Sequence, residues 1–292
     1  MGLPLSLLGS VAAVVLASCA QAGTPGEVID VFPDSGVTVA DWSGSTLRFT
    51  EPPKRVVSLV PAVTSMLVSL GAGNDLAGRT DFDTISAVLA LPSVGDGLRP
   101  SLEHLLILEP DLVIRYEGPQ DPSTGPALDA RDIPHMGVRT DRIEDVAAIL
   151  VQLGRIMGRE AQAGELVERF EVELEEVRQR VAKRPAVRAA YLLPGDPPWV
   201  VGSDTYLGEI LEIAGAENVF GDLGRPYAPV SIEGILMRAP DAFVVAEGTA
   251  VDERFRAHAP VYQVSRGIET PGLTLGTSAR ELARALHPGA LP

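Results

Sequence analysis

Two glutamates, Glu103 and Glu233, occupy the same position in a motif that occurs twice. The motif is Ser-x-Glu-x-x-Leu-x-x-x-Pro-Asp, and its copies begin at Ser101 and Ser231, 130 positions apart. In each copy the glutamate lies in the first turn of a predicted helix, where the helix dipole favours an ionised carboxylate. Such residues are common in first turns for that reason alone. A matched pair on two similar units could also contact a cationic partner at two points and fix its orientation.

A second group of side chains follows the predicted strands, where the chain leaves the sheet. Loops at the carboxyl ends of parallel strands form the ligand crevice of α/β folds. Aromatic faces there suit a flat, largely apolar ligand, and arginines suit an anionic one. The arginines could instead pair with Asp81 or Asp83, and the aromatic residues could instead pack in a core. The predicted ligand-binding residues are Arg79, Asp81, Phe82, Arg115, Tyr116, Trp199, Tyr227 and Glu247.

No pattern in the sequence indicates catalysis. It contains no Gly-rich phosphate loop, no nucleophile elbow, no metal-binding His pair and no sequence-local acid/base pair of carboxylates. The four histidines have no ligand-like spacing, which argues against a zinc or manganese site. We therefore predict a protein that is not an enzyme and that holds neither a metal ion nor a cofactor of its own.

The composition indicates a globular, acidic protein. Hydrophobic residues make up 46% and charged residues 22% of the 292 residues, which excludes a disordered chain. The net charge of -15 would repel phosphate backbones, so nucleic acid is not an expected partner.

The elements that must position these side chains alternate between strands and helices. In the first half we predict strands at 55–60, 76–78, 111–115 and 133–138, and helices at 64–71, 101–109 and 143–157. In the second half we predict strands at 187–193, 199–201 and 241–246, and helices at 206–214, 231–238 and 278–286. This alternation predicts the α/β class, with two Rossmann-like lobes that each contain a mainly parallel sheet.

A long amphipathic helix is predicted between the two lobes. From residue 159 to 184, apolar residues recur at steps of three and four among many charged ones. Its roughly 25 residues would extend about 37 Å, so it would join the lobes as one rigid rod.

The N-terminus has the features of an export signal. Residues 3–16 are uncharged and mostly apolar, too short to span a bilayer but suited to a signal peptide. They end in Leu-Ala-Ser-Cys, which resembles a bacterial lipobox, so Cys19 is the predicted lipidation site. Residues 1–10 lack the usual Lys or Arg, and a buried helix with an ordinary core cysteine is the alternative.

These features predict six segments along the chain. They are a lipoprotein signal peptide (1–18), a tether (19–35), a lead-in hairpin (36–54), an N-terminal α/β lobe (55–158), an inter-lobe helix (159–184) and a C-terminal α/β lobe (185–292).

The whole pattern resembles the periplasmic binding proteins of ABC importers for cobalamin, ferric siderophores and haem, whose lobes are joined by one rigid helix. The resemblance covers roughly residues 36–288. It is carried by the segments 55–65 (RVVSLVPAVTS), 70–73 (LGAG), 100–103 (PSLE), 110–114 (PDLVI), 215–220 (GAENVF), 230–233 (VSIE) and 240–241 (PD).

The resemblance implies a substrate-binding lipoprotein that captures a cobalamin-type corrinoid between its lobes. In that family a glutamate on each lobe docks onto arginines of the permease, and Glu103 and Glu233 match those positions. In the cobalamin binders, aromatic residues at positions matching Tyr116, Trp199 and Tyr227 line the cleft. Residues 95–97 (GDG) stand where a further aromatic residue is expected, so a ferric siderophore or haem is the alternative ligand.

The resemblance also implies the partners and the location of the protein. The partners would be a permease dimer with its ATPase subunits and a small-molecule ligand. The protein would be a monomer, exported and lipid-anchored at the cell membrane, on its periplasmic or extracellular face. A sensory or adaptor lipoprotein on the same fold would not need the two docking glutamates, and both are present.

Overall fold

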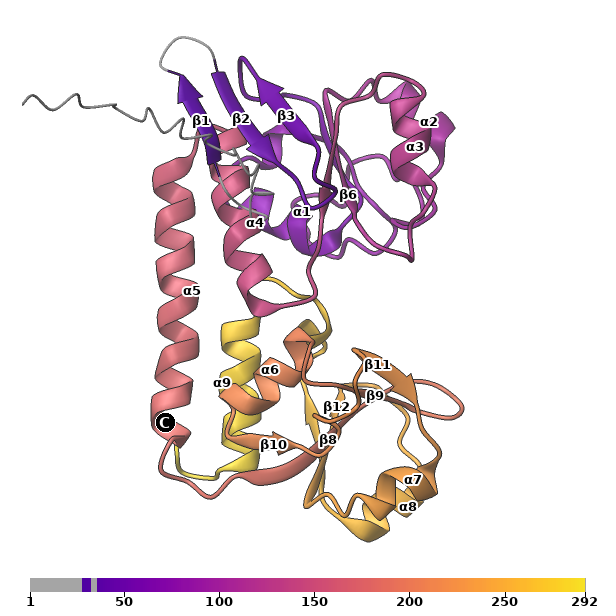
Figure 1. Cartoon of the computed structure of the whole chain (residues 1–292), viewed down its shortest axis with the longest axis vertical. Coiled ribbons are helices and arrows are strands. Elements are labelled where there is room, and N and C mark those ends of the chain that lie inside the picture. The colour runs from indigo at the N-terminus through magenta and orange to yellow at the C-terminus, as the bar shows by residue number, and fades with distance from the viewer. Residues whose placement is uncertain (1–27, 33–35, 292) are drawn as a thin grey trace, which may run out of the picture.

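The computed structural model describes residues 28–32 and 36–291. It has two α/β lobes, with the long helix α5 (Glu160–Val181) running beside both of them (Figure 1). The predicted signal peptide and Cys19 lie outside the described residues. Within the described ranges, no helix is long and apolar enough to cross a membrane.

The N-terminal lobe is built on a four-stranded parallel sheet of order β5-β4-β6-β7. The central strands β4 and β6 begin with buried apolar residues, as expected for parallel strands that are covered on both faces. The elements of this lobe are β4 (Val56–Ser58), α1 (Pro61–Ser69), the 3-10 helix η1 (Gly73–Asp75), β5 (Leu76–Gly78), α2 (Leu102–Ile107), β6 (Leu112–Tyr116), α3 (Thr124–Asp129), β7 (His135–Val138) and α4 (Ile143–Ile156).

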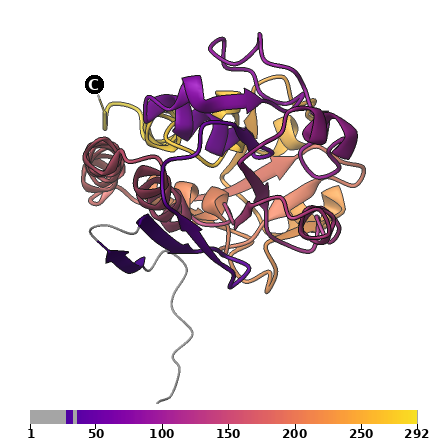
Figure 2. The same cartoon turned by 90° about the horizontal axis from the view of Figure 1, so that it is seen from above.

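A small antiparallel sheet precedes this lobe. Its strands are β1 (Val28–Phe32), β2 (Gly36–Ala40) and β3 (Thr46–Phe49), and β2 and β3 form a hairpin. Figure 2 shows this sheet beside the end-on helices α4 and α5. Strand β1 falls within the segment predicted as a tether, which was wrong for these residues. The sequence Val-Ile-Asp-Val-Phe favours a strand, and β2 offers it an edge to pair with.

The C-terminal lobe contains a six-stranded sheet of order β11-β9-β8-β12-β13, in which β10 also pairs with β8. Pairs among β10, β8, β12 and β13 are parallel, whereas β9 and β11 are antiparallel additions, so the sheet is mainly parallel. The elements of this lobe are β8 (Val187–Leu193), β9 (Trp199–Val201), α6 (Tyr206–Ile213), β10 (Ala216–Asn218), β11 (Tyr227–Pro229), α7 (Ile232–Met237), β12 (Ala242–Ala246), α8 (Glu253–His258), β13 (Val261–Val264), η2 (Arg266–Glu269) and α9 (Leu275–Leu286).

Helix α5 packs against α4 of the first lobe and α9 of the second. Its buried side chains, which include Leu166, Phe170, Leu174 and Val177, recur at steps of three and four and so form one apolar face. Its 22 residues extend about 33 Å. The predicted architecture of two α/β lobes joined by one long helix is therefore confirmed.

Several element boundaries differ from the prediction. Helix α1 begins at Pro61 and not at the predicted residue 64, because the fixed φ of proline suits the first helical position. Helix α3 was not predicted, because it begins in a segment rich in Pro, Gly and Ser, a composition typical of loops. Helix α8 and strand β13 were not predicted, because a six-residue and a four-residue element contain too little periodicity to be recognised.

Candidate ligand cavity and docking surface

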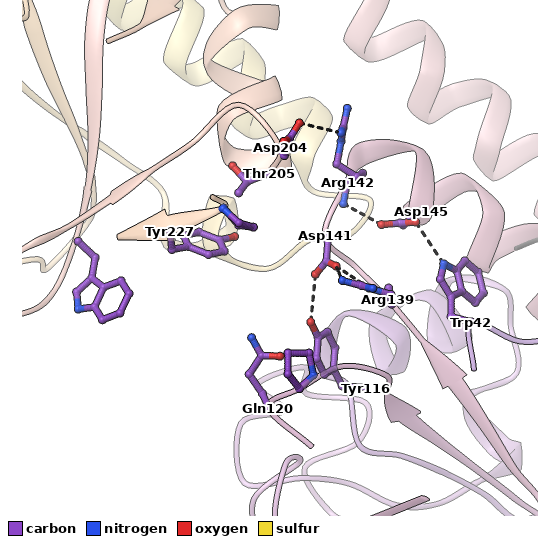
Figure 3. A pocket seen from close by; sticks show the side chains of 13 residues that line it. Trp42, Tyr116, Gln120, Arg139, Asp141, Arg142, Asp145, Asp204, Thr205 and Tyr227 are labelled. Atoms are coloured by element: carbon purple, nitrogen blue, oxygen red, sulfur yellow. Dashed lines mark hydrogen bonds and ion pairs between the residues drawn. The ribbon is translucent and has the colours of Figure 1, made fainter. Parts of the chain in front are cut away.

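A cavity of about 760 Å³ lies between the two lobes. This volume falls in the range of roughly 300–1,000 Å³ that is usual for small-molecule sites. One wall comes from the β2–β3 turn, the end of β6 and the connection from β7 to α4, and the other from β9, β11 and the start of α6 (Figure 3). The cavity is therefore placed where the lobes meet.

Three of the eight predicted ligand-binding residues line this cavity: Tyr116, Trp199 and Tyr227. Tyr116 is the last residue of β6, and Trp199 and Tyr227 begin β9 and β11. Trp199 is 41% exposed, so much of its ring can still contact a ligand. The aromatic faces come from both lobes, and a flat molecule between the lobes would contact both sets.

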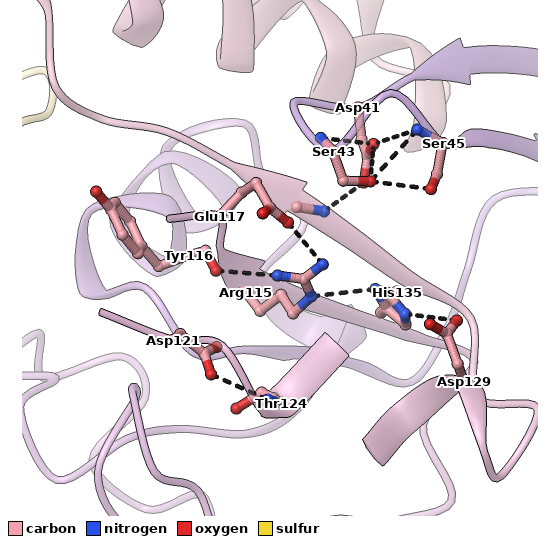
Figure 4. Close-up of polar contacts among 11 residues, drawn as sticks. Asp41, Ser43, Ser45, Arg115, Tyr116, Glu117, Asp121, Thr124, Asp129 and His135 are labelled. Atoms are coloured by element: carbon pink, nitrogen blue, oxygen red, sulfur yellow. Dashed lines mark hydrogen bonds and ion pairs between the residues drawn. The ribbon is translucent and has the colours of Figure 1, made fainter. Parts of the chain in front are cut away.

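Trp42 also lines the cavity, although the sequence analysis missed it. It lies in the β2–β3 turn, where its backbone N–H donates to the carbonyl of Gly137 (3.1 Å) and its indole N–H to Asp145 (3.4 Å). The buried carboxylate of Asp41 fastens the turn to β7 by accepting from the N–H of Gly137 (2.7 Å; Figure 4). One feature of the sequence could have indicated this role of Trp42: it is a large aromatic residue in a predicted turn, where small polar residues are usual.

A hydrogen-bonded cluster forms the polar part of the wall. The hydroxyl of Tyr116 donates to Asp141 (3.2 Å), and the Arg139 guanidinium donates to the other oxygen of the same carboxylate (2.8 Å). Burial, reinforced by the charge of Asp141, raises the pKa of Tyr116 to about 12. Burial, with a smaller contribution from Asp141, also raises the pKa of Tyr227 to about 12. Both phenols are therefore neutral hydrogen-bond donors at physiological pH.

Contacts at the back of the cavity hold the two lobes together. Glu209 of α6 accepts from the guanidinium of Arg142 (2.6 Å) and from the backbone N–H of Ile143 (2.7 Å), at the start of α4. The backbone N–H of Tyr206 donates to the carbonyl of Asp141 (2.7 Å). The starts of α4 and α6 are thereby joined, which fixes the spacing of the two walls at that point.

Arg115, one of the predicted ligand-binding residues, does not face the cavity. It is 5% exposed, forms an ion pair with Glu117 (2.7 Å), and donates to Nδ1 of His135 (3.2 Å; Figure 4). Successive side chains of a strand point to opposite faces, so Arg115 is turned away when its neighbour Tyr116 faces the ligand space.

The remaining predicted ligand-binding residues also lie outside the cavity: Arg79, Asp81, Phe82 and Glu247. Three of them follow β5, which is the edge strand farthest from β7, whereas the cavity lies on the β6–β7 side of the sheet. Arg79 donates to the carbonyl of Thr80 (2.7 Å), and within the described part of the chain it forms no ion pair with Asp81 or Asp83. Glu247 is exposed and follows β12.

The described residues offer no group of three or more His, Cys, Asp or Glu side chains that could hold a metal ion.

The two copies of the repeated motif form the same structure, one in each lobe. The side chains of Ser101 and Ser231 cap α2 and α7 by accepting from the N–H three residues later, each at 3.2 Å. Leu105 and Ile235 are fully buried and attach each helix to its lobe. The shared Ser of the motif, and the apolar residue just before its shared Leu, are therefore explained by the fold.

The Pro-Asp end of the motif has a structural role in both lobes as well. Asp111 accepts from the backbone N–H of Arg55 (2.9 Å), and Asp241 from that of Arg188 (3.3 Å). The guanidinium of each arginine donates in turn to carbonyl groups at the end of the motif helix, α2 (3.0 Å) or α7 (2.8 Å). Each motif helix is thus held against the first strand of its own lobe.

The glutamates of the motif have no such role. Both are exposed, and within the described residues Glu103 makes no hydrogen bond or ion pair, while Glu233 pairs at 2.8 Å with Arg254 at the protein surface. Helices α2 and α7 both lie on the side of the molecule away from α5 (Figure 1). The two exposed glutamates thus belong to helices that lie on the same side of the molecule, one in each lobe.

Comparison with known proteins gives consistent results. Residues 56–266 match the family described as periplasmic binding protein. An ABC transporter substrate-binding lipoprotein of Bacillus subtilis is 27% identical over 307 aligned positions, which cover 95% of this chain and 94% of the relative. A vitamin B12-binding protein of Vibrio parahaemolyticus is 28% identical over 211 positions, 70% of this chain and 74% of the relative.

Among solved structures, the apo form of the periplasmic haem-binding protein RhuT from Roseiflexus has the same fold. Its TM-score is 0.70 at 22% identity, and the match covers 81% of this chain and 99% of that protein.

Proposed function

The chain belongs to the periplasmic binding protein family and is the substrate-binding protein of an ABC importer, and on that premise we propose that it captures a cobalamin-type corrinoid between its lobes. Its partners are a permease with ATPase subunits, and its ligand is a small molecule. It is not an enzyme.

The wall of the inter-lobe cavity is the observation that carries the corrinoid proposal. Trp42 and Tyr116 on one side, and Trp199 and Tyr227 on the other, offer aromatic faces to a flat macrocycle. Tyr116 and Gln120 add hydrogen-bonding groups for the amide arms of a corrin ring. The similarity to a vitamin B12-binding protein supports the same ligand class.

The charges of the cavity favour a corrinoid over an anionic ferric chelate. Arg139 is paired with Asp141, and Arg142 is paired with Glu209. The charge of each arginine is thus already balanced by a carboxylate, and an anionic ligand would also meet the carboxylates of Asp145 and Asp204. A ligand without a large negative charge meets no such obstacle.

Haem is the alternative suggested by the fold of the Roseiflexus protein. Haem iron in proteins takes an axial His, Cys, Met or Tyr. None of the residues lining the cavity in the described ranges is His, Cys or Met. Tyr116 and Tyr227 are available, but a pKa of about 12 disfavours the phenolate that would bind iron.

We further propose that Glu103 and Glu233 dock onto arginines of the permease. The Ser and Asp positions of the motif serve the fold, whereas the two glutamates are exposed to solvent on helices that lie on one side of the molecule. Two anionic contacts at separate points would orient the protein on a permease of two-fold symmetry.

The same proposal includes the anchor and the oligomeric state. Removal of residues 1–18 would leave Cys19 as the lipidated N-terminus, followed by a short tether, and the protein would work as a monomer at the outer face of the cell membrane.

Calorimetric titration tests the ligand proposal. The purified protein is titrated separately with cobalamin, haem and a panel of ferric siderophores. We expect saturable binding of cobalamin with a sub-micromolar Kd and no binding of the other ligands. Binding of haem or a ferric chelate without binding of cobalamin would contradict the corrinoid assignment and leave the transport role in place.

A further inference from the structure

A large, exposed apolar side chain lies one helical turn after each docking glutamate. Ile107 follows Glu103 by four residues and is 70% exposed, and Met237 follows Glu233 by four residues and is 85% exposed. Residues four apart on a helix lie on the same face. Each lobe therefore presents a carboxylate and an apolar side chain together, at equivalent positions of the repeat.

The fold of each lobe does not require these two apolar residues. The core contact of α2 is made by the fully buried Leu105, and that of α7 by the fully buried Ile235. A single exposed apolar residue needs no explanation, because folded proteins expose many of them. Here, however, an exposed apolar residue recurs at the same position after both copies of the glutamate, and the fold requires neither the apolar residue nor the glutamate.

We propose that Ile107 and Met237 are docking residues, which rests on the proposed role of the two glutamates. The partner is the permease of the importer. Its surface would carry, once in each half, an arginine for the glutamate and an apolar socket about one helical turn away. Leu106, which is 46% exposed, would enlarge the apolar contact in the first lobe.

The two kinds of contact would act on different steps of docking. Exposed carboxylates attract a cationic surface from a distance, which raises the association rate and is weakened by salt. Exposed ion pairs add little to the affinity, and Glu233 must first leave its partner Arg254. Burial of Ile107 and Met237 would instead slow dissociation, because apolar burial is hardly screened by salt.

Binding kinetics on the intact importer test this proposal. Nanodiscs that contain the permease–ATPase complex of the source cell are immobilised, and the double variant Ile107→Ser/Met237→Ser flows over them. We expect its dissociation to be at least about tenfold faster than that of the wild type, with an unchanged salt dependence of association. The double variant Glu103→Gln/Glu233→Gln should instead associate more slowly and lose the salt dependence.

Two controls separate docking from folding. Val172 on α5 is 50% exposed, and Val172→Ser removes apolar surface away from the docking helices, so its kinetics should match the wild type. All variants should bind cobalamin as the wild type does. If Ile107→Ser/Met237→Ser dissociates at the wild-type rate while the glutamate variant is impaired, the proposed role of the two apolar residues is wrong and that of the glutamates stands. If the wild type binds none of the source cell's importer complexes, or if the glutamate variant docks normally, the proposed docking role of Glu103 and Glu233 is itself wrong.

Discussion

Trp42 shows how a single side chain of the ligand cavity depends on contacts that are distant in the sequence. Its turn belongs to a separate small sheet, and hydrogen bonds to Gly137 and Asp145, far away in the sequence, place that turn beside the cavity. Phe82 is the opposite case. It follows a predicted parallel strand, but that strand is at the far edge of its sheet, and the ring is 64% exposed outside the cavity.

These two aromatic residues give a direct comparison. Trp42→Ala removes one aromatic face from the cavity, and we expect the affinity for cobalamin to fall roughly tenfold, since such a face contributes on the order of 1–2 kcal/mol. Phe82→Ala removes a more exposed ring away from the cavity and should leave the affinity unchanged. Calorimetric titration of both variants measures this difference, and the reverse result would place the ligand in the loop after β5.

The sequence allowed part of the candidate site to be predicted. Tyr116, Trp199 and Tyr227 could be placed near a ligand because each lies at a predicted strand end or matches the family pattern. The side on which Arg115 points depends on the strand register, which the apolar run alone did not settle. Arg139 was missed because it follows β7, and the pairing of β7 with β6, which brings Arg139 close to Tyr116, is a property of the folded sheet.

At the scale of elements, regular periodicity was the reliable guide. Strands β8 and β9 have the predicted bounds, and α5 differs only at its ends. The repeated motif predicted two equivalent helices, and its Ser and Pro-Asp positions are explained by caps and clamps that recur in both lobes. Strand β11 and its antiparallel pairing with β9 were not predicted, because the pairing of strands is a property of the folded sheet.

The contact between α4 and α5 predicts opposite effects for two glycines. A Cβ atom at Gly154 of α4 would collide with the Cβ of Ala163 and press on the carbonyl of Arg159, whereas one at Gly164 of α5 would meet no atom within 4 Å. Gly154→Ala should therefore lower the free energy of unfolding by about 1–3 kcal/mol. Gly164→Ala should raise it by up to about 1 kcal/mol, because alanine favours a helix.

Thermal or denaturant unfolding of the two variants provides the measurement. Equal stabilisation by both substitutions would mean that α5 does not pack closely on α4. That result would contradict a rigid connection between α5 and the N-terminal lobe.

At the scale of the whole molecule, the arrangement of α5, the cavity and the two motif helices agrees with capture of a ligand between the lobes and delivery from the side away from α5. The helix α5 runs beside both lobes, the cavity lies between the lobes, and the two motif helices face away from α5 (Figure 1). A stiff helix that packs on both lobes resists bending, so we expect the distance between Glu103 and Glu233 to stay nearly constant when ligand binds. Such a spacing suits a partner whose two contact points are also fixed.

Uptake of cobalamin by cells tests this account most directly. Cells that lack their own copy of this protein are supplied with the wild type or with the double variant Glu103→Ala/Glu233→Ala, and the uptake of labelled cobalamin is measured beside the cobalamin affinity of each purified protein. We expect the wild type to restore uptake and the variant to fail while it binds cobalamin equally well. Full uptake through the variant, or a loss of cobalamin binding in it, would contradict the separation between ligand capture in the cavity and delivery through the two glutamates.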